Sequence, residues 1–492
     1  MAFIDGSVVS VALPALQADL NTSVRGSQWI VNAYMLTLGA LMLAGGAAGD
    51  RYGRRRIFTL GVILFSAASI ACGLAPNVSA LIAARTLQGI GGALMVPESL
   101  AIISAAFPEK ERGRAIGTWA GFSALTTALG PVLGGWLVDV ASWRAIFFVN
   151  VPLGIITLAI AFRHVPESRD EAAPHAVDWL GGILATLGLG ALAYGLTAAS
   201  ELPWSHPMVL GSVLASAPLL TLFVWWEKRT RAPMMPLQLF SSRRFSGANA
   251  VTLLLYFSLG GALFFVPFNL IGVQGYSATA AGAAFLPFTL IMGGLSRWSG
   301  ALAERYEPRG PLTVGPAIVA AGLALFALPD IGQSYWTGFL PAMAVLGFGM
   351  AVSVAPLTTT VMESAGDRYG GVASGINNAT SRVAGLLAVA LLGAIAVGFF
   401  RADLNERLAS AHVPEQVRAE MQSEASKLAQ AKTPAVRDEQ QRRQLTRMQQ
   451  EAFVHSFRVV MLLTAGTALL SAFCAWLTIR SDDRRKSNAR VS

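Results

Sequence analysis

The sequence predicts an all-α polytopic membrane protein, and three observations support this fold class. Of the 492 residues, 54% are hydrophobic and only 13% are charged, whereas about 25% of the residues in an average soluble domain are charged. The charges lie in short segments between long apolar runs, each about as long as the 20 residues that a helix needs to cross the hydrocarbon core. The basic residues also favour every second connection between these runs, as expected for a chain that crosses a membrane repeatedly.

Fourteen apolar runs are predicted as transmembrane helices. They cover approximately residues 1–18, 28–48, 57–75, 79–104, 114–138, 144–163, 178–199, 207–226, 246–270, 279–300, 311–328, 336–360, 371–399 and 456–479. Short turns rich in Gly, Pro and Asn separate most of them. The first run has neither the basic start nor the cleavage site of a signal peptide, so we expect it to stay in the membrane.

The Lys and Arg residues predict the orientation. Seven alternate connections hold 22 of them, while the intervening short loops hold only Arg25 and Arg144. Because basic loops stay in the cytoplasm, both termini are predicted to be cytoplasmic. We expect the long segment 400–455 outside, with a short helix at 414–431, as a solvated cap or a partner-docking surface. The net charge of +9 is explained by this topology, so no nucleic-acid partner is predicted.

An internal repeat predicts two related halves. Gly46, Asp50, Arg51, Tyr52 and Arg55 recur as Gly300, Glu304, Arg305, Tyr306 and Arg309, at a constant offset of 254. Duplicated helical halves around a central site are an architecture of transporters. We therefore predict two six-helix halves (1–163 and 246–479), two inserted helices with their linkers (164–245), and a cytoplasmic tail (480–492).

The first copy of this repeat is a candidate gating loop. We call it the clasp and define it by its conspicuous residues: Gly46, Asp50, Arg51, Gly53, Arg54 and Arg55. Asp50 can pair with Arg51 or Arg54, and such a pair can form in one conformation and break in another. The alternative is a basic anchor at the cytoplasmic surface without any gating role.

The clasp resembles the pattern G-x-x-x-D-R-x-G-R-[RK], which the major facilitator superfamily carries between its second and third spans. The family's fourth-span pattern, R-x-x-Q-G-x-G, is matched by Arg85, Gln88, Gly89 and Gly91. The resemblance implies that Arg85 influences proton exchange on a nearby carboxylate. Gly89 lies on the face of Arg85, so this face can pack against protein. The alternative is an Arg that extends outward to the membrane surface.

Two further segments indicate the type of transporter. Gly130, Pro131, Gly134 and Gly135 resemble the family's antiporter motif, with Thr126 in place of its first Gly, and this implies export. A proline kink without directional meaning is the alternative. The stretch from Asp5 to Pro14 resembles the signature of fourteen-span drug:proton antiporters of the EmrB/QacA type, and it departs from that signature at Ser7 and Ser10.

Asp5 is therefore the candidate proton site, because a carboxylate in a low-dielectric cavity can bind a proton at working pH. A surface position at the cytoplasmic face is the alternative. Other polar residues in apolar runs are candidates for a substrate cavity or for contacts between helices. They are Asn32, Tyr34, Gln88, Asn378, Ser381 and Arg382.

The resemblance implies a proton-coupled exporter of small amphipathic organic compounds that works by alternating access in the inner (plasma) membrane. It leaves open whether a periplasmic adaptor takes part. Export of one dedicated metabolite and a non-transporting membrane sensor are the alternatives. An enzyme is not predicted, since the apolar runs hold no cluster of His, Cys or paired carboxylates. No phosphate-binding loop, cofactor motif or metal-ligand spacing is present.

Overall fold

The structure is a computed structural model, and it describes residues 1–169, 176–295, 298–299, 307–366, 369–411, 413–434 and 438–479. Within these residues all regular structure is helical. Ten of the described helices are long and apolar enough to cross a membrane, and three shorter apolar helices accompany them. The chain is therefore a multi-pass, all-helical membrane protein.

The first group of helices packs mainly with itself. It comprises α1 (Ala2–Asp19), α2 (Val24–Tyr52), α3 (Arg54–Gly73), α4 (Val78–Ala106), α5 (Glu109–Val140), α6 (Ala145–Phe148) and α7 (Asn150–His164). Helix α4 packs between α2 and α3, while α5 packs on α1. Small residues permit the close approach: a Cβ on Gly91 of α4 would lie 2.6 Å from the backbone nitrogen of Phe65 in α3.

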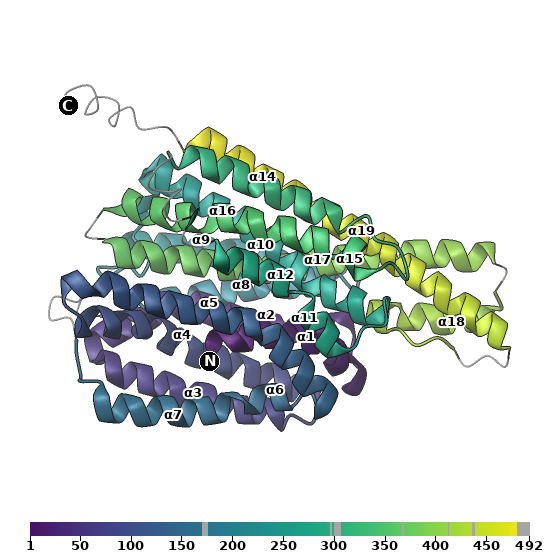
Figure 1. Cartoon of the computed structure of the whole chain (residues 1–492), viewed down its shortest axis with the longest axis horizontal. Helices are drawn as coiled ribbons and strands as arrows, with labels where there is room; N and C mark the ends of the chain where they lie inside the picture. The colour runs from purple at the N-terminus through teal and green to yellow at the C-terminus, as the bar shows by residue number, and fades with distance from the viewer. Residues whose placement is uncertain are drawn as a thin grey trace.

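The second group follows two connecting helices, α8 (Trp179–Ala198) and α9 (Pro207–Arg229), of which α8 packs on α2 and α17. Its members are η1 (Leu237–Ser241), α10 (Arg243–Gly272), α11 (Ala278–Ala283), α12 (Leu286–Gly294), α14 (Arg309–Leu325), α15 (Tyr335–Gly338), α16 (Leu340–Ala365), α17 (Gly370–Ser410), α18 (Glu415–Glu424), η3 (Ala425–Gln430) and α19 (Glu439–Thr478). In Figure 1 the purple and blue helices of the first group lie below the green and yellow helices of the second.

Each of the fourteen predicted runs overlaps at least one helix, but three runs are divided. Run 144–163 forms α6 and α7, run 279–300 forms α11 and α12, and run 336–360 falls on α15 and α16. Both α12 and α16 have a proline in their first turn. A proline lacks the N–H that would continue a helix, but it fits the first turn of a new one.

The predicted loop 400–455 is largely helical. Helix α17 continues to Ser410, α19 begins at Glu439, and α18 with η3 lies within the expected segment 414–431. We call the described residues within 400–455 the extension, and Figure 1 shows it projecting from the bundle with α18 as one of its helices. Arg407 joins its helices, because it pairs with Asp403 of α17 at 2.5 Å and with Glu451 of α19.

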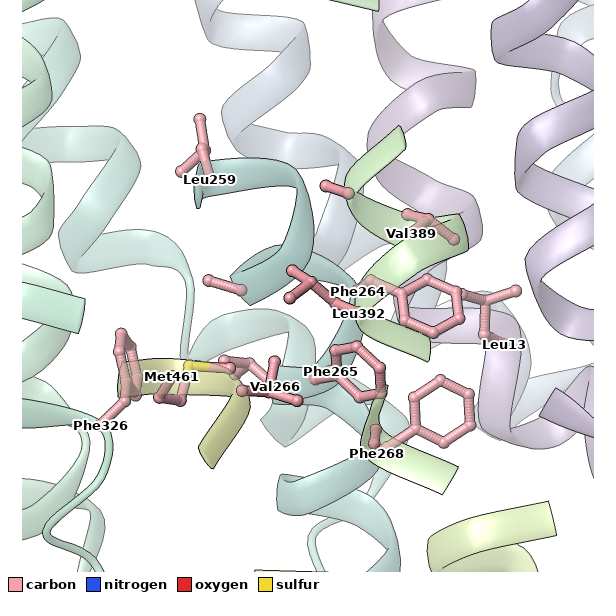
Figure 2. Close-up of a cluster of buried hydrophobic side chains, with 14 of the residues drawn as sticks. Leu13, Leu259, Phe264, Phe265, Val266, Phe268, Phe326, Val389, Leu392 and Met461 are labelled. Carbon is pink, nitrogen blue, oxygen red and sulfur yellow. The ribbon is translucent and has the colours of Figure 1, made fainter. Parts of the chain in front are cut away.

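A large apolar core lies between the two groups near the extension. Leu13 of α1 belongs to the same buried cluster as Phe264 of α10 and Val389 of α17. Figure 2 shows these side chains close together, with Phe265 and Phe268 beside them. The first helix is thus packed against the second group, and the site described next lies on the same helix.

Candidate functional site

Asp5 lies deep inside the bundle. It is in the first turn of α1 and is fully buried. Asp19, at the other end of α1, bonds to Trp143 and Arg144 near the extension. Fourteen residues separate the two acids, which is about 21 Å of helix. Because the hydrocarbon core is about 30 Å thick, this separation fits an Asp5 carboxylate well below the surface that Asp19 marks.

Three side chains from two other helices bind the Asp5 carboxylate. Arg85 of α4 donates from Nη1 to Oδ2 at 2.6 Å. Gln88 of α4 donates from Nε2 to Oδ1 at 2.8 Å, and Asn150 of α7 donates from Nδ2 to the same oxygen at 3.0 Å. The structure therefore brings together Asp5, Arg85 and Gln88, all of which the sequence had singled out.

The Arg85 guanidinium is enclosed by protein. The residue is only 1% exposed, and its Nε donates to the carbonyl of Ile30 at 3.1 Å. The guanidinium carbon lies 4.2 Å from the centroid of the Tyr34 ring and 5.8 Å from that of Phe147. These aromatic faces attract a cation. Arg85 thus points into the bundle and does not extend to the membrane surface.

Gln88 connects the acid to α3. Its Oε1 accepts from Arg85 Nη1 at 2.7 Å and from Cys72 Sγ at 3.6 Å, while its Nε2 also donates to Ser69 Oγ at 2.7 Å. Both amide atoms are therefore fully engaged. A buried polar network of this kind is stable only while its members stay paired, so a change on one member affects the others.

Asn150, Ser69 and Cys72 are further site residues that were not predicted from the sequence. All three are fully buried, and Asn150 Oδ1 has no hydrogen-bond partner among the described residues. A lone Asn within an apolar run was a usable signal, since polar groups inside a membrane segment usually face protein or a cavity. Ser69 and Cys72 carried no such signal, because small polar residues are common in membrane helices.

The remaining cavity candidates make none of the described hydrogen bonds to Asp5. Tyr34 belongs to the site, but Asn32 does not: it is fully buried, and neither of its amide atoms has a described partner. On α17, Ser381 Oγ bonds the carbonyl of Asn378, whose side chain is exposed. Arg382 of α17 packs beside Gly39 of α2.

The clasp ends α2 and begins α3. Arg54 donates to Asp50 Oδ1 from Nη2 at 2.7 Å and from Nε at 2.9 Å. Gly53, between the helices, has φ +110°, a conformation that is costly for any residue with a Cβ. The Arg51 guanidinium lies over the Tyr52 ring at 5.0 Å.

The clasp also binds the segment that follows α7. Arg54 N donates to the carbonyl of Ser168 at 2.8 Å, and Arg55 N donates to Glu167 Oε1 at 3.0 Å. Glu167 also pairs with the Arg55 side chain at 3.9 Å. Gly46 packs on Pro97 of α4. Residues 300–306, which hold most of the second copy of the repeat, lie outside the described residues. Arg309 of this copy begins α14.

The antiporter-type segment of α5 lies against both groups of helices. A Cβ on Gly130 would overlap the Ser7 hydroxyl of α1, and one on Gly135 would overlap the Ala278 carbonyl of α11. Gly134 packs in the same way on Val8, and the Pro131 carbonyl faces Gly282 of α11. Asp139 extends this contact, since it accepts hydrogen bonds from Ala278 N at 3.1 Å and Thr279 N at 2.7 Å.

Comparison with known proteins agrees with this architecture. The family model described as Major Facilitator Superfamily matches residues 1–389. Multidrug resistance protein Stp of Mycobacterium tuberculosis (strain CDC 1551 / Oshkosh) is 33% identical over 482 residues, which cover 97% of this chain and 89% of that protein. The tetracenomycin C resistance and export protein of Streptomyces glaucescens is 35% identical over 419 residues, or 84% of this chain and 77% of that protein.

Solved structures share the fold at low sequence identity. A bacterial homologue of the human lysosomal transporter Spinster, in an inward-facing and occupied conformation, has a TM-score of 0.63 and 18% identity, covering 98% of this chain and 94% of that chain. A D-xylose–proton symporter has a TM-score of 0.58 and 15% identity, covering 97% and 94%. The family match over most of the chain and the full-length relatives lead to one conclusion: this chain belongs to the Major Facilitator Superfamily.

Proposed function

We propose that the protein is a proton-coupled antiporter that exports small amphipathic organic compounds by alternating access. The observation that carries the proposal is the Asp5–Arg85 pair, which is buried, linked at 2.6 Å and held by residues of α4 and α7. Charged groups inside a membrane segment are costly and are retained mainly for function. Asp5 is the proton-binding group in this proposal, and Arg85 is the group that responds to its charge.

Protonation of Asp5 removes the charge that balances Arg85. The guanidinium then keeps its contacts with Gln88, the Ile30 carbonyl and the Tyr34 ring, but it loses the one carboxylate partner that it has among the described residues. A buried cation without a counter-ion is unstable. The protonated and deprotonated states therefore favour different arrangements of α1 and α4, which is the kind of two-state element that alternating access requires.

Export rather than uptake is supported by two observations. The α5 segment that resembles the antiporter motif packs directly on α1 and α11. The relatives include proteins named for resistance to, or export of, multiple drugs, tetracenomycin C and methylenomycin A. Export of a single dedicated metabolite is the second candidate, because such names cover both broad and narrow substrates.

The topology in this proposal is the fourteen-span arrangement with two six-helix halves. The 22 Lys and Arg residues of alternate connections support an orientation with the clasp and both termini in the cytoplasm and the extension outside the plasma membrane. The inner face of the bundle, including Asn32, Asn378, Ser381 and Arg382, then borders the route of the substrate.

Ethidium flux in proteoliposomes under an imposed pH gradient tests the proposal. Wild type should transport ethidium without any adaptor, and Asp5→Asn should lose gradient-driven flux because Asn cannot bind the proton. Asp19→Asn is the matched control, since Asp19 is half-exposed at the other end of α1. Equal flux in wild type and Asp5→Asn would mean that the coupled proton binds to a residue other than Asp5. No flux with ethidium or a wider panel of compounds would remove the multidrug function and favour a narrow exporter or a sensor.

A further inference from the structure

A second buried acid lies on α4 away from the Asp5 site. Glu98 is fully buried, and neither of its carboxylate oxygens has a hydrogen-bond partner among the described residues. It follows Arg85 by thirteen residues, or about 20 Å of helix. Glu98 therefore belongs to the end of α4 that packs beside the clasp, not to the network around Asp5.

The Glu98 carboxyl group fills a space that a glycine of α2 leaves open. A Cβ on Gly49 would lie on top of the carboxyl carbon and both oxygens of Glu98. Gly49 directly precedes Asp50 of the clasp and is itself buried. Glu98 thus packs against the backbone of α2, the helix that carries the clasp. This position is available only because Gly49 has no side chain.

The charged groups around Glu98 do not offer it a free cation. Among the described side chains, the charges that act on it are Asp50 of α2, Arg54 of α3 and Glu167 after α7. Arg54 already donates two hydrogen bonds to Asp50. A buried carboxylate with two acidic neighbours and no available partner is unstable as an anion, so these surroundings favour its neutral form.

We propose that Glu98 is a second proton-binding group, and that its proton controls the clasp. In the protonated state Glu98 rests against Gly49 while Arg54 stays with Asp50. When its O–H bond breaks, the proton passes to water at the clasp end of the bundle, and the new carboxylate competes with Asp50 for the Arg54 guanidinium. Loss of one proton thereby loosens the contact between α2 and α3.

The link to transport rests on the proposed function, but the proton on Glu98 does not. If the protein is a proton antiporter, Glu98 lies at the cytoplasmic end, where protons are released, and Asp5 lies deeper in the bundle. The two acids are then separate proton-binding sites. Protonation of Asp5 affects Arg85, and protonation of Glu98 affects the clasp. Protonation of Glu98 can be measured without substrate, so its outcome does not depend on whether the protein is an antiporter.

Infrared difference spectroscopy of the purified protein in lipid bilayers tests the proton directly. Raising the pH should remove the C=O stretching band of a protonated carboxyl group in wild type. Glu98→Gln should lack that component. Glu363→Gln is the matched control, because Glu363 is 54% exposed and pairs with Arg244 at 2.9 Å; it should retain the band. An unchanged difference spectrum in Glu98→Gln would overturn the proposal.

Gly49→Ala provides a second test that keeps the acid. The added methyl group would displace the carboxyl group towards water, so the band should disappear at a lower pH than in wild type. An identical titration in Gly49→Ala would show that the seat against α2 has no role. This variant also covers the case in which Glu98→Gln folds poorly, because it leaves Glu98 in the chain.

The effect on the clasp is measured with a fluorescent label at Tyr52→Cys in a Cys474→Ala background. Tyr52 is 47% exposed and adjoins Gly53, whereas the remaining Cys72 is fully buried. The label should report a pH-dependent change that coincides with the infrared titration, and Glu98→Gln should abolish it. A label response that survives Glu98→Gln would separate the clasp from Glu98. Loss of ethidium flux in Asp5→Asn, or its persistence, bears only on the proposed function.

Discussion

Asp5 and Arg85 can each be buried only because the other is present. Removing two charges from water is expensive, and their mutual attraction offsets the cost only when the geometry is good and the remaining donors and acceptors are used. Here Gln88 and Asn150 supply the additional hydrogen bonds to Asp5. The pair therefore contributes little net stability, and in the proposed function it serves conformational control instead.

Removing one member of the pair should destabilise the protein more than removing both charges. We expect Arg85→Ala to lower the free energy of unfolding by about 3–5 kcal/mol, because it leaves a buried carboxylate unpaired. The double variant Asp5→Asn with Arg85→Gln should recover much of this loss, although it should not transport ethidium against a gradient. Thermal unfolding of the purified variants measures the difference. Equal destabilisation by the single and double variants would contradict the pairing argument.

The sequence could identify the charged members of the site but not their partners. Asp5 and Arg85 are charges within apolar runs, so each one requires an explanation. Asn150 binds Asp5 from α7, and Ser69 of α3 accepts a hydrogen bond from Gln88; only the packing of four helices decides that these residues meet. The sequence shows Glu98 as a charged residue within an apolar run. Its contact with Gly49 could not be predicted, because it depends on how α2 packs on α4.

The backbone of Gly53 makes a second prediction at this scale. Gly53→Ala should cost about 1–3 kcal/mol, because a residue with a Cβ is strained at φ +110°. The new methyl group would also approach Glu167 Oε1 within 2.7 Å. Thermal unfolding compares it with Gly370→Ala, where an added Cβ meets nothing within 4 Å. Equal stability of the two variants would exclude a structural role for the glycine of the clasp.

Helix α5 fits closely at the boundary between the two groups. Its glycines contact α1 on one side and α11 on the other, while Asp139 binds the backbone amides that begin α11. The carboxylate stabilises that end because the first amides of a helix lack partners within the helix. This contact is one of those that join the first group to the second.

Filling the space beside α5 should separate it from α11. Gly135→Val should cost about 1–3 kcal/mol through overpacking, and it should reduce ethidium flux more than it reduces the amount of folded protein. Gly211→Val in α9 is the matched control, since nothing lies within 4 Å of its added Cβ, and its effect should stay within about 0.5 kcal/mol. Comparable flux in the two variants would argue against a role for the α5–α11 contact.

The apolar pattern predicted the existence of the helices better than their ends. The ends of runs 57–75 and 178–199 differ by at most a few residues from the ends of α3 and α8. The agreement follows because the part of a helix that contacts lipid and the protein core must be apolar. Hydrophobicity does not report how far α17 and α19 continue as charged helices. Their continuation depends on ion pairs such as Arg407–Glu451 and on packing of one helix against the other.

For the whole molecule, hydrogen bonds join the two groups at the end near the extension. Gln28 of α2 donates to the carbonyl of Val389 in α17 at 2.5 Å. Gln17 of α1 donates to the carbonyl of Lys427 in η3 at 3.0 Å, and Lys427 Nζ donates to Asn21 Oδ1 at 2.9 Å. The extension therefore holds the end of α1, and any movement that opens this end must break these bonds.

Acid should weaken this attachment. Partial burial pushes the pKa of Glu424 upward, but hydrogen bonds from Lys427 and from the backbone of Lys432 outweigh it and hold the pKa below its usual range. A carboxylate with a lowered pKa stabilises the fold at pH values above its unfolded pKa of about 4.3, and this contribution is lost as the pH falls through the lower folded value. Protonated Glu424 no longer orients Lys427 towards Asn21.

Hydrogen exchange of amides in residues 415–430 measures the effect. At pH 7, Glu424→Gln should exchange up to roughly fivefold faster than wild type, since a partly exposed pair contributes at most about 1 kcal/mol. The difference should vanish at low pH, because both proteins then lack the carboxylate. Comparison at equal pH removes the intrinsic pH dependence of exchange. Glu415→Gln is the control, since Glu415 is 83% exposed and should leave exchange unchanged. Equal exchange of Glu424→Gln and wild type at pH 7 would mean that the extension is held on α1 without this ion pair.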